Sequence, residues 1–466
     1  MKKGTKGKIR SRPVSMKKET GNDGVIPGPK ALDWVIRDES VISRSYTRSY
    51  PLVAESGKGA RVTDVDGNEY LDFTSGLGTS LTGHCHPEIV KVITDQAKKL
   101  IHMSGTDFYY TSQIRLAEEI SEMMPGKTPQ KVFFSNSGTE ANEAAIKLAR
   151  YATNRPQFIA FQGSFHGRTM GALALTGSKT VQKKSFFPMM PGVTHVAYPN
   201  CYRCPINLKY PSCGVACVET IRETVLKTTI PPDDVAAIFV EPVQGEGGYV
   251  VPPPDYFKKL KALADEFGIL LITDEVQSGS GRTGKFLAIE HFGVVPDVVT
   301  LAKGIASGMP LGITVSRSSL MTWGPGSHAS TFGGHPISAE AALKTLELLK
   351  GGLMENAARV GTFLIKRLNE LKLKHRLMGD VRGLGLMIGI ELVKDRESKE
   401  RAVEERNAVV QACFKKGFLV VGCGQNTVRF LPPLVITEKE AAEALALFEE
   451  ALTETERKTF PLKKAV

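Results

Sequence analysis

Short apolar runs alternate with helix-like stretches through the middle of the chain. The runs KVFF, FIAF, AAIFV, ILLIT and VVTL, which end at residues 134, 161, 240, 273 and 301, are apolar apart from one lysine and two threonines and do not alternate with polar residues. Strands that are buried on both faces have this composition. Alanine and leucine at helical spacing mark the stretches between them, for example 140–152 and 253–268. The alternation predicts an α/β layer with a mostly parallel sheet.

The pattern changes after about residue 337. A long helical stretch is expected to run to about Lys374, and strand-like segments follow at 378–393 and 417–434. A helical pattern at 437–457 closes the chain, so we predict a smaller α+β domain with an antiparallel-type sheet. The predicted organisation is a basic disordered tail, a segment packing with the small domain, a large domain and a small domain, at residues 1–30, 31–75, 76–336 and 337–466.

The net charge of +11 is concentrated at the amino terminus. Six of these charges come from the first twelve residues: Lys2, Lys3, Lys6, Lys8, Arg10 and Arg12. Because this stretch is poor in apolar residues, we interpret it as a solvated tail and expect neither nucleic-acid binding nor a secretory signal. A start at Met16 would remove it. No apolar run is long enough to cross a membrane, and a cytoplasmic location is the default expectation.

Four of the seven cysteines lie close together, at Cys201, Cys204, Cys213 and Cys217. Two close pairs could bind zinc as four thiolates or form disulfides. The second pair is wider than a typical zinc knuckle, however, and nothing indicates a secreted protein. A surface loop with free thiols is the favoured interpretation, and no metal site is predicted.

Ser137, Gly138 and Thr139 lie where a strand gives way to a helix. The strand is expected to end at Phe134 and the helix to begin near Glu140. Free backbone N–H groups at a helix N-terminus bind anions, and a phosphate fits such a site. The alternative is simple helix capping.

Two charged residues follow strongly apolar runs. Lys303 comes after VVTLA and is followed by the glycine-rich loop 304–312, which suits a desolvated lysine whose amine is free to attack a carbonyl. Asp274 ends ILLIT, where a carboxylate is costly unless a cation pairs with it. A protonated ring nitrogen would serve, although a hydrogen-bonded structural aspartate is the simpler alternative for Asp274 alone.

The stretch FQGSFHGRT adds an aromatic ring and a cation. Phe165 can stack on a planar cofactor, and Arg168 can bind a carboxylate through its bidentate guanidinium. His166 is included among the cofactor-binding candidates, although by itself it is more simply a structural histidine. Pyridoxal 5′-phosphate is one cofactor that matches all four features. Its aldehyde can react with the lysine, its ring nitrogen can pair with the aspartate, its phosphate fits the anion site, and its ring can stack on the aromatic side chain.

Seven motifs in this order cover most of the chain between about Pro51 and Pro433. They are GHCHP, SNSGTEANEAAIKLAR, SFHGRTMGALALTGS, EPVQGEGG, TDEVQSGSGRTG, LAKGIASGMPLG and STFGGHP. The set resembles the class III pyridoxal-phosphate aminotransferases, and within them the 4-aminobutyrate branch. The resemblance implies fold type I, with a mostly parallel large domain and a smaller α+β domain.

The resemblance also implies roles for individual residues. Lys303 would form the Schiff base and shuttle the proton, and Asp274 would hold the pyridine nitrogen. Val276 would lie against the ring face opposite Phe165, and Gln277 would bond the ring hydroxyl. The remaining cofactor residues concern the phosphate: Gly138 and Thr139 from the same chain, and Thr331 donated by the neighbouring subunit. A shared site of this kind requires a homodimer or a higher homo-oligomer.

Substrate choice is implied by four further residues. Glu246 and Arg429 match a pair that the family uses as a switch: the glutamate masks the arginine for an ω-amine and swings away when an α-carboxylate arrives. Arg168 would take the distal carboxylate, and two such arginines suit 2-oxoglutarate. Leu77 occupies a pocket position where the ornithine enzymes carry tyrosine, which disfavours ornithine.

We therefore expect an aminotransferase that moves an amino group from an ω-amino acid such as 4-aminobutyrate to 2-oxoglutarate by ping-pong kinetics. Its partners would be a small-molecule amine donor and a 2-oxo acid. An amino-acid racemase of the same family, with Glu246 near enough to act as its second acid-base group, and an ornithine aminotransferase remain alternatives. A nucleotide-binding dehydrogenase is disfavoured, because GLGTSLTG lacks the strand, glycine spacing and following acid of that motif.

Overall fold

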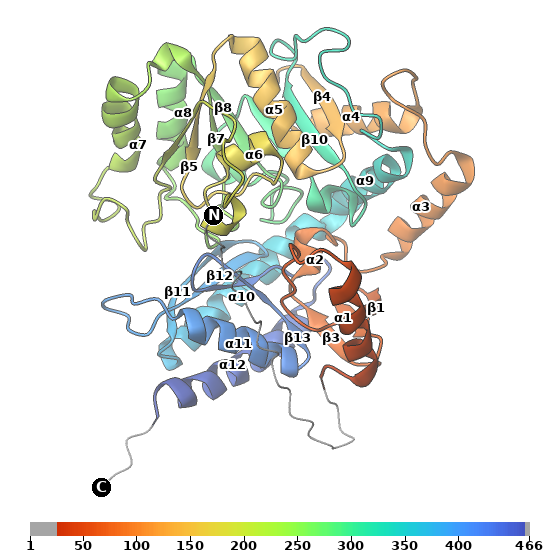
Figure 1. The fold of residues 1–466 in the computed structure, drawn as a ribbon, viewed down its shortest axis with the longest axis vertical. Coiled ribbons are helices and arrows are strands. Elements are labelled where there is room, and N and C mark those ends of the chain that lie inside the picture. Colours follow the sequence, from red (N-terminus) through yellow and green to blue (C-terminus); the bar gives the residue numbers. More distant parts are fainter. Residues whose placement is uncertain (1–25, 462–466) are drawn as a thin grey trace, which may run out of the picture.

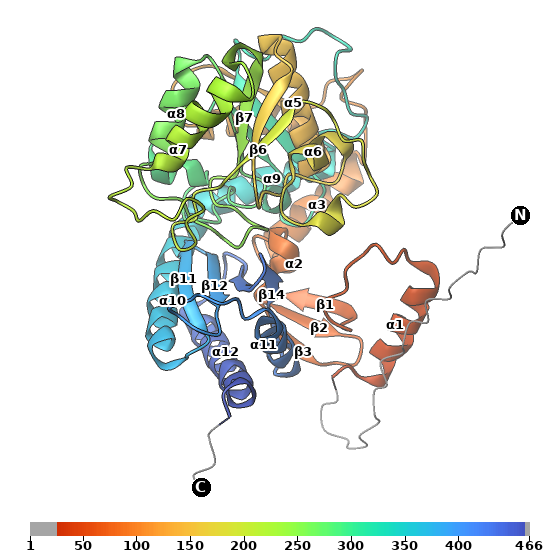
Figure 2. The same ribbon diagram turned by 60° about the vertical axis from the view of Figure 1, so that its left-hand side comes forward.

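The computed structural model describes residues 26–461, and three sheets organise this part of the chain. A seven-stranded sheet lies in one half of the molecule with helices on both of its faces, and two four-stranded sheets lie in the other half (Figures 1 and 2). The basic residues of the tail and Met16 lie outside the described residues. The predicted domain boundaries remain a prediction.

The seven-stranded sheet has the order β4-β10-β9-β8-β7-β5-β6. All neighbours among β5 to β9 are parallel, whereas β10 is antiparallel to both β4 and β9. The predicted mostly parallel sheet is therefore confirmed, with one reversed strand that the apolar pattern did not indicate. The strands are β4 (Gln130–Ser135), β5 (Gln157–Phe161), β6 (Val193–Val196), β7 (Val235–Val240), β8 (Leu270–Asp274), β9 (Val298–Leu301) and β10 (Gly312–Arg317).

The central strands are apolar throughout because both faces are covered. In β7, Phe239 joins a core that includes the buried face of α5 (Gly138–Thr153), while Ile238 and Val240 join the core on the other face. That second core includes Leu260 of α8 (Tyr256–Glu266). Side chains alternate between the two faces of a strand, so every position is buried in this sandwich.

The other two sheets are built from both ends of the described chain. The order β11-β12-β15-β14 is antiparallel throughout, and β1-β2-β3 receives β13 in parallel, with Phe418 opposite Leu71. Residues of the amino-terminal segment therefore pair directly with a carboxy-terminal strand. These strands are β1 (Ala54–Lys58), β2 (Arg61–Asp64), β3 (Glu69–Asp72), β11 (Met378–Leu384), β12 (Met387–Leu392), β13 (Phe418–Leu419), β14 (Val421–Cys423) and β15 (Thr427–Phe430).

The long helix expected up to Lys374 is two helices. α9 (Pro336–Leu348) and α10 (Met354–Lys374) are separated by a π-helical turn at Leu349–Leu353. Gly352 has φ +125° there, a conformation that interrupts regular α-helix and that glycine adopts readily. The other helices are α1 (Pro29–Val41), α2 (Ser75–Gly78), α3 (Pro87–Lys99), α4 (Thr111–Met123), α6 (Met170–Leu175), α7 (Ala216–Thr220), α11 (Val403–Lys415) and α12 (Glu438–Thr459).

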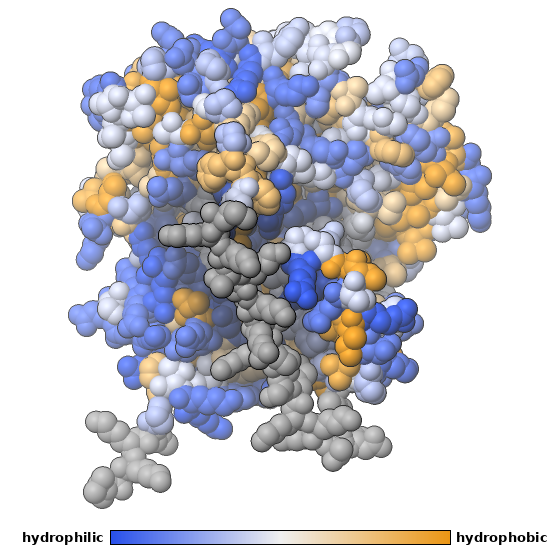
Figure 3. Space-filling model, viewed as in Figure 1, coloured by the Kyte–Doolittle hydropathy of each residue, from blue (hydrophilic) through white to orange (hydrophobic). Residues whose placement is uncertain are grey.

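Within residues 26–461, none of the helices combines the length and the apolar character needed to cross a membrane. Apolar side chains nevertheless gather on the surface over α1 and around α3 (Figure 3). Ile36 and Val41 of α1 are 67% and 79% exposed, and Ile101, just beyond α3, is 63% exposed. Exposed apolar groups of this kind are typical of contact surfaces.

His375, at the end of α10, forms an ion pair with α12. Its Nδ1 lies 2.9 Å from Glu456 Oε2, and Glu456 Oε1 accepts a hydrogen bond from the backbone of Leu377. The hydrogen bond to Glu456 raises the pKa of His375, against the lowering effect of burial. A raised folded-state pKa gives stabilisation that is complete below the unfolded pKa of about 6.5 and is lost as the pH rises through the folded value.

We therefore expect His375→Gln to lower the free energy of unfolding by about 1–2 kcal/mol at pH 6. At pH 9 the decrease should be smaller than at pH 6 by about 1 kcal/mol. Melting curves of variant and wild type at both pH values measure the difference. Lys458→Gln, which breaks an exposed ion pair with Glu454 on the same helix α12, is the control and should change little at either pH. An equal loss for His375→Gln at both pH values would contradict the ion-pair explanation.

Candidate active site

A cavity of about 220 Å³ lies at the carboxyl ends of the parallel strands. This edge is where open α/β sheets bind their ligands. Thirteen residues line it, from five separate stretches of sequence: Gly138, Thr139, Asn142, Phe165, His166, Gly167, Arg168, Glu241, Glu246, Asp274, Val276, Gln277 and Lys303. The structure thus brings together most of the residues that the sequence predicted for the site.

Lys303 enters the cavity from the short connection between β9 and β10. Its backbone has φ +47°, and a side chain on Gly304 would come within 3.1 Å of the carbonyl oxygen of Gly78. The glycine after the lysine is therefore needed for close packing of the connection. Burial lowers the pKa of Lys303, opposed by Asp274 and reinforced by Arg429. A lowered pKa leaves more of the amine uncharged at neutral pH, as a nucleophile requires.

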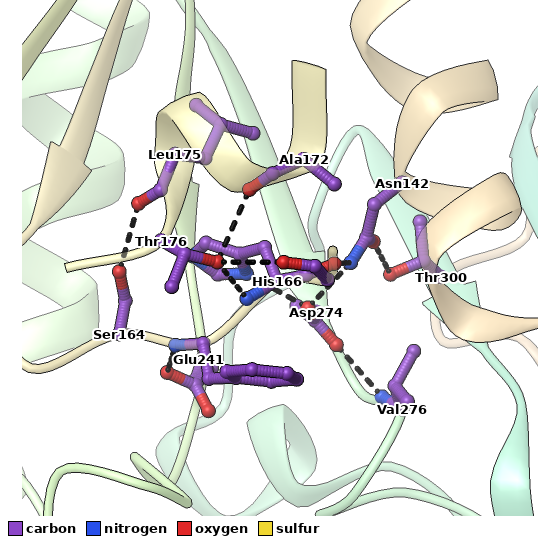
Figure 4. Close-up of polar contacts among 12 residues, drawn as sticks. Asn142, Ser164, His166, Ala172, Leu175, Thr176, Glu241, Asp274, Val276 and Thr300 are labelled. Carbon is purple, nitrogen blue, oxygen red and sulfur yellow. Dashed lines mark hydrogen bonds and ion pairs between the residues drawn. The ribbon is translucent and has the colours of Figure 1, made fainter. Parts of the chain in front are cut away.

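Asp274, at the end of β8, is held by three hydrogen bonds (Figure 4). Its Oδ2 lies 2.8 Å from His166 Nδ1 and accepts a 2.8 Å hydrogen bond from Asn142 Nδ2, while Oδ1 accepts the backbone N–H of Val276. Asn142 is itself fixed by Thr300, whose hydroxyl donates to Asn142 Oδ1. This carboxylate is therefore oriented before any ligand binds.

His166 lines the cavity next to Asp274. Its side chain is fully buried, and its ring packs edge-on against Phe239 with the centroids 4.8 Å apart. Nδ1 is directed at Asp274, and Nε2 has no hydrogen-bond partner among the described residues. The contact that the structure shows for His166 is thus support of the aspartate, which agrees with its simpler structural interpretation.

Ser137 caps α5 and does not line the cavity. Its Oγ accepts from the backbone of Glu140 and donates to the carboxylate of Glu140. Gly138 and Thr139, which follow it, do line the cavity at the N-terminus of the helix. A side chain on Gly138 would come within 2.7 Å of Val276, so this position has room for glycine only. The helix N-terminus therefore presents backbone N–H groups to the cavity, as an anion site requires.

Glu241 is a buried site residue that the sequence analysis missed. It follows β7, and its two oxygens accept the backbone N–H groups of Phe165 and Gly245. Burial raises the pKa of Glu241 to about 7, although the nearby His166 opposes this. The sequence could have indicated Glu241, because this glutamate follows an apolar run just as Asp274 does. Asn142 was also missed, since an amide on a helix gives no comparable signal.

Glu246 and Arg429 form an ion pair beside the cavity. Arg429 NH1 donates to Glu246 Oε1 at 2.8 Å, and Arg429 Nε is buried with no partner among the described residues. Lys179, which the sequence analysis did not single out, donates to the other oxygen, Oε2, at 3.0 Å. Burial by itself would raise the pKa of Glu246, but the charges of Arg429 and Lys179 outweigh it and lower the pKa to about 2.

Three predicted substrate or cofactor residues lie at or beyond the rim. Arg168 lines the cavity, but its side chain is exposed, with the guanidinium 5.6 Å from the ring centre of Phe165. Leu77 is 47% exposed and Thr331 lies on an exposed turn, and neither lines the cavity within this chain. The structure therefore does not bring Leu77 and Thr331 together with Lys303 in one cavity.

The cavity fits pyridoxal phosphate. It offers a buried amine on Lys303, a fixed carboxylate on Asp274 and a helix N-terminus for the phosphate. Phe165 and Val276 line it beside these groups, and the buried Oε1 of Gln277 has no hydrogen-bond partner among the described residues. Each of the cofactor's polar groups thus has a matching group in the wall.

The four clustered cysteines lie apart from this cavity, around a small hollow of their own. All seven cysteines carry free thiols. Between residues 26 and 461, no three or more His, Cys, Asp or Glu side chains are grouped so that they could hold a metal ion.

Comparisons with known proteins place this geometry in context. The family model described as aminotransferase class-III matches residues 41–452. A leucine/methionine racemase of Thermococcus litoralis is 40% identical, covering 90% of this chain and 97% of its own. The 4-aminobutyrate aminotransferase GabT of Escherichia coli is 38% identical over 90% and 98% of the two chains. A crystal structure of a Bacillus anthracis aminotransferase has a TM-score of 0.85 at 33% identity, covering 92% and 99%.

Proposed function

The chain belongs to the class III aminotransferases, a pyridoxal-phosphate-dependent family of fold type I, and we propose that it moves an amino group from an ω-amino acid such as 4-aminobutyrate to 2-oxoglutarate. Membership confirms the family resemblance and the cofactor, and aminotransferases of this family use an amine donor and a 2-oxo acid. Membership also excludes the dehydrogenase alternative. A cytoplasmic location stays a prediction.

The ion pair between Glu246 and Arg429 is the observation that carries the proposal. Arg429 has a buried guanidinium that can bind a carboxylate in bidentate fashion, but Glu246 covers it at 2.8 Å. An ω-amino acid has no carboxylate near its amine and leaves this pair intact. 2-Oxoglutarate has one carboxylate for Arg429, once Glu246 moves, and another for the exposed Arg168.

The residues around the cavity have separate tasks in this reaction. Pyridoxal phosphate, when bound, takes up the amino group at its aldehyde carbon and withdraws electrons from the substrate carbon that bears the nitrogen. Lys303 Nζ, whose pKa is lowered by burial, would take the proton from that carbon and hold it at the amine. Asp274, fixed by His166 and Asn142, holds a positive charge against its carboxylate. Phe165 and Val276 line the site with apolar surface, which would limit water beside the reacting groups.

We further propose that the active enzyme is at least a homodimer. Thr331 and its neighbour Phe332, which is 55% exposed, lie outside the cavity of their own chain. A hollow of about 920 Å³ is lined by Ser330 and Gly333 from the same turn, and Tyr109, which is 95% exposed, lies close to it in sequence. Exposed aromatic groups are typical of surfaces that a partner covers, which suits a second copy of the chain.

A racemase remains the second candidate, because the Thermococcus litoralis racemase is as similar to this chain as the aminotransferase relative is. A racemase must deliver a proton to the face opposite the lysine. Glu246 faces the same cavity as Lys303, but its pKa of about 2 keeps it ionised near neutral pH, so it has no proton to donate there. The ion pair thus supports a switching role for Glu246 better than an acid-base role.

The test is the visible spectrum of the holoenzyme before and after 4-aminobutyrate is added without an oxo acid. Loss of the band of the lysine-bound cofactor would support the proposal, and recovery on adding 2-oxoglutarate would complete it. A protein that ignores 4-aminobutyrate but converts L-leucine or L-methionine into its D-enantiomer, without net amino transfer, would be a racemase instead.

Arg429→Met should separate the two half-reactions. We expect kcat/KM for 2-oxoglutarate and L-glutamate to fall by about 10²-fold, since a bidentate carboxylate contact is lost. The 4-aminobutyrate half-reaction should change by no more than about three-fold, because that substrate leaves Arg429 covered. Single-turnover bleaching with each donor measures both values. Equal losses for both donors would place the α-carboxylate site elsewhere.

A further inference from the structure

Glu246 is held by two cations of different character. Arg429, on its Oε1, has a side chain only 6% exposed, whereas Lys179, on its Oε2, is 42% exposed. The two oxygens of one carboxylate therefore contact different cations, one the buried arginine and the other the partly exposed lysine. A glutamate that leaves Arg429 can keep its contact with Lys179.

Lys179 is able to follow such a movement. It precedes the short 3₁₀ turn Thr180–Gln182, and the only side-chain contact described for it is the one to Glu246. Its long flexible stem and partial exposure leave the ammonium group free to move with the carboxylate. Arg429, by contrast, is fixed in the strand β15 and packs over the ring of Tyr249.

A second cation balances the charge of the site when a substrate carboxylate is bound. With an α-carboxylate on Arg429, the site holds two carboxylates, and Lys179 and Arg429 supply one positive charge for each. Without Lys179, two carboxylates would share a single arginine, which like-charge repulsion disfavours. Arg406 also lies nearby, but its described hydrogen bonds go to Asn407 Oδ1 and the carbonyl oxygen of Thr427, and no ion pair with a carboxylate is described for it.

We propose that Lys179 is a positioning residue that holds Glu246 after it leaves Arg429, and so determines how readily the site accepts ligands with an α-carboxylate. This inference rests on the proposed switch between ω-amino and α-carboxylate substrates. Lys179 touches neither the cofactor site nor the reacting atoms and acts through Glu246 alone.

The experiment compares Lys179→Met with Lys179→Arg and with Lys184→Met in the holoenzyme. Lys184 is an exposed lysine five positions along the same loop, and no ion pair is described for it. Single-turnover bleaching by L-glutamate should slow about five-fold in Lys179→Met, while bleaching by 4-aminobutyrate changes less than about two-fold. Lys179→Arg should recover most of the loss, and Lys184→Met should behave as wild type.

Equilibrium binding gives a readout that does not depend on turnover. Glutarate, which carries a second carboxylate for Arg429, should bind about five-fold more weakly to Lys179→Met, and butyrate, which lacks it, should be unaffected. Equal weakening of both acids, or equal slowing with both donors, would show a merely structural role. Tighter binding of glutarate to Lys179→Met would show that Lys179 only holds Glu246 on Arg429, which also overturns the proposal.

The two proposals fail in distinguishable ways. A wild type that does not respond to 4-aminobutyrate contradicts the proposed substrate, but the comparison of glutarate with butyrate still tests Lys179. A wild type that binds glutarate no more tightly than butyrate overturns the inference directly, because Arg429 would then not accept a carboxylate.

Discussion

Replacing Lys303 with alanine should reduce turnover by about 10³-fold or more. Among the described residues, this amine is the only lysine group that lines the cavity, and its lowered pKa suits both attack on a carbonyl and proton transfer. Alanine removes the nucleophile and the acid-base group together. Turnover with 4-aminobutyrate and 2-oxoglutarate measures the loss, and circular dichroism checks that the variant folds.

Lys303→Arg is the matched variant for this experiment. It keeps a positive charge in the cavity but cannot lose a proton near neutral pH, so its turnover should fall about as far as that of the alanine variant. Either variant with near-full activity would end the assignment of Lys303. If the arginine variant were active and the alanine variant inactive, residue 303 would contribute only its positive charge.

Asp274→Asn should lower kcat by about 10²–10³-fold. Asparagine has nearly the same shape and can still accept a hydrogen bond from Asn142 or His166, so the change mainly removes the negative charge from the wall. Without that charge a cationic ring nitrogen is no longer stabilised. Turnover measures this loss, and dialysis followed by the visible spectrum measures how well the cofactor is retained.

Asp297→Asn is the control for Asp274→Asn. Asp297 is a buried carboxylate at the opposite end of the sheet, where it accepts the backbone N–H of Leu271 and contacts Lys261 and Arg317. Its loss should lower the melting temperature but leave kcat of the folded enzyme unchanged. If both variants lost activity equally, the effect of Asp274 would be general destabilisation.

The two charged residues at the centre of the predicted site share one physical signal. Lys303 and Asp274 are charged groups that follow apolar strands, where burial is costly unless the chemistry needs it. The same signal predicted the parallel strands, because a run buried on both faces is apolar throughout. The direction of β10 gave no such signal, since a buried strand has the same composition whichever way it runs.

Lys179 shows what the sequence could not provide. It is one of several lysines in the stretch 179–184, and nothing in that stretch distinguishes it from Lys183 or Lys184. Its contact with Glu246 joins positions 67 residues apart and depends on how two loops meet above the sheet. The division of the helix after residue 336 has a similar origin, because two glycines in a helical pattern indicate flexibility without showing where the chain turns.

The reversed direction of β10 determines how much the chain around Lys303 could change in length. A parallel successor to β9 would need a crossover connection of about a dozen residues or more, usually a helix. Because β10 is antiparallel and adjacent, the connection from Ala302 to Leu311 needs no crossover to the other end of the sheet, and paired residues such as Leu301 and Ile313 anchor it on both sides. Lengthening it by even a residue would shift the amine relative to Asp274. Variation within related chains should therefore collect in the outer loops, while this connection keeps its length.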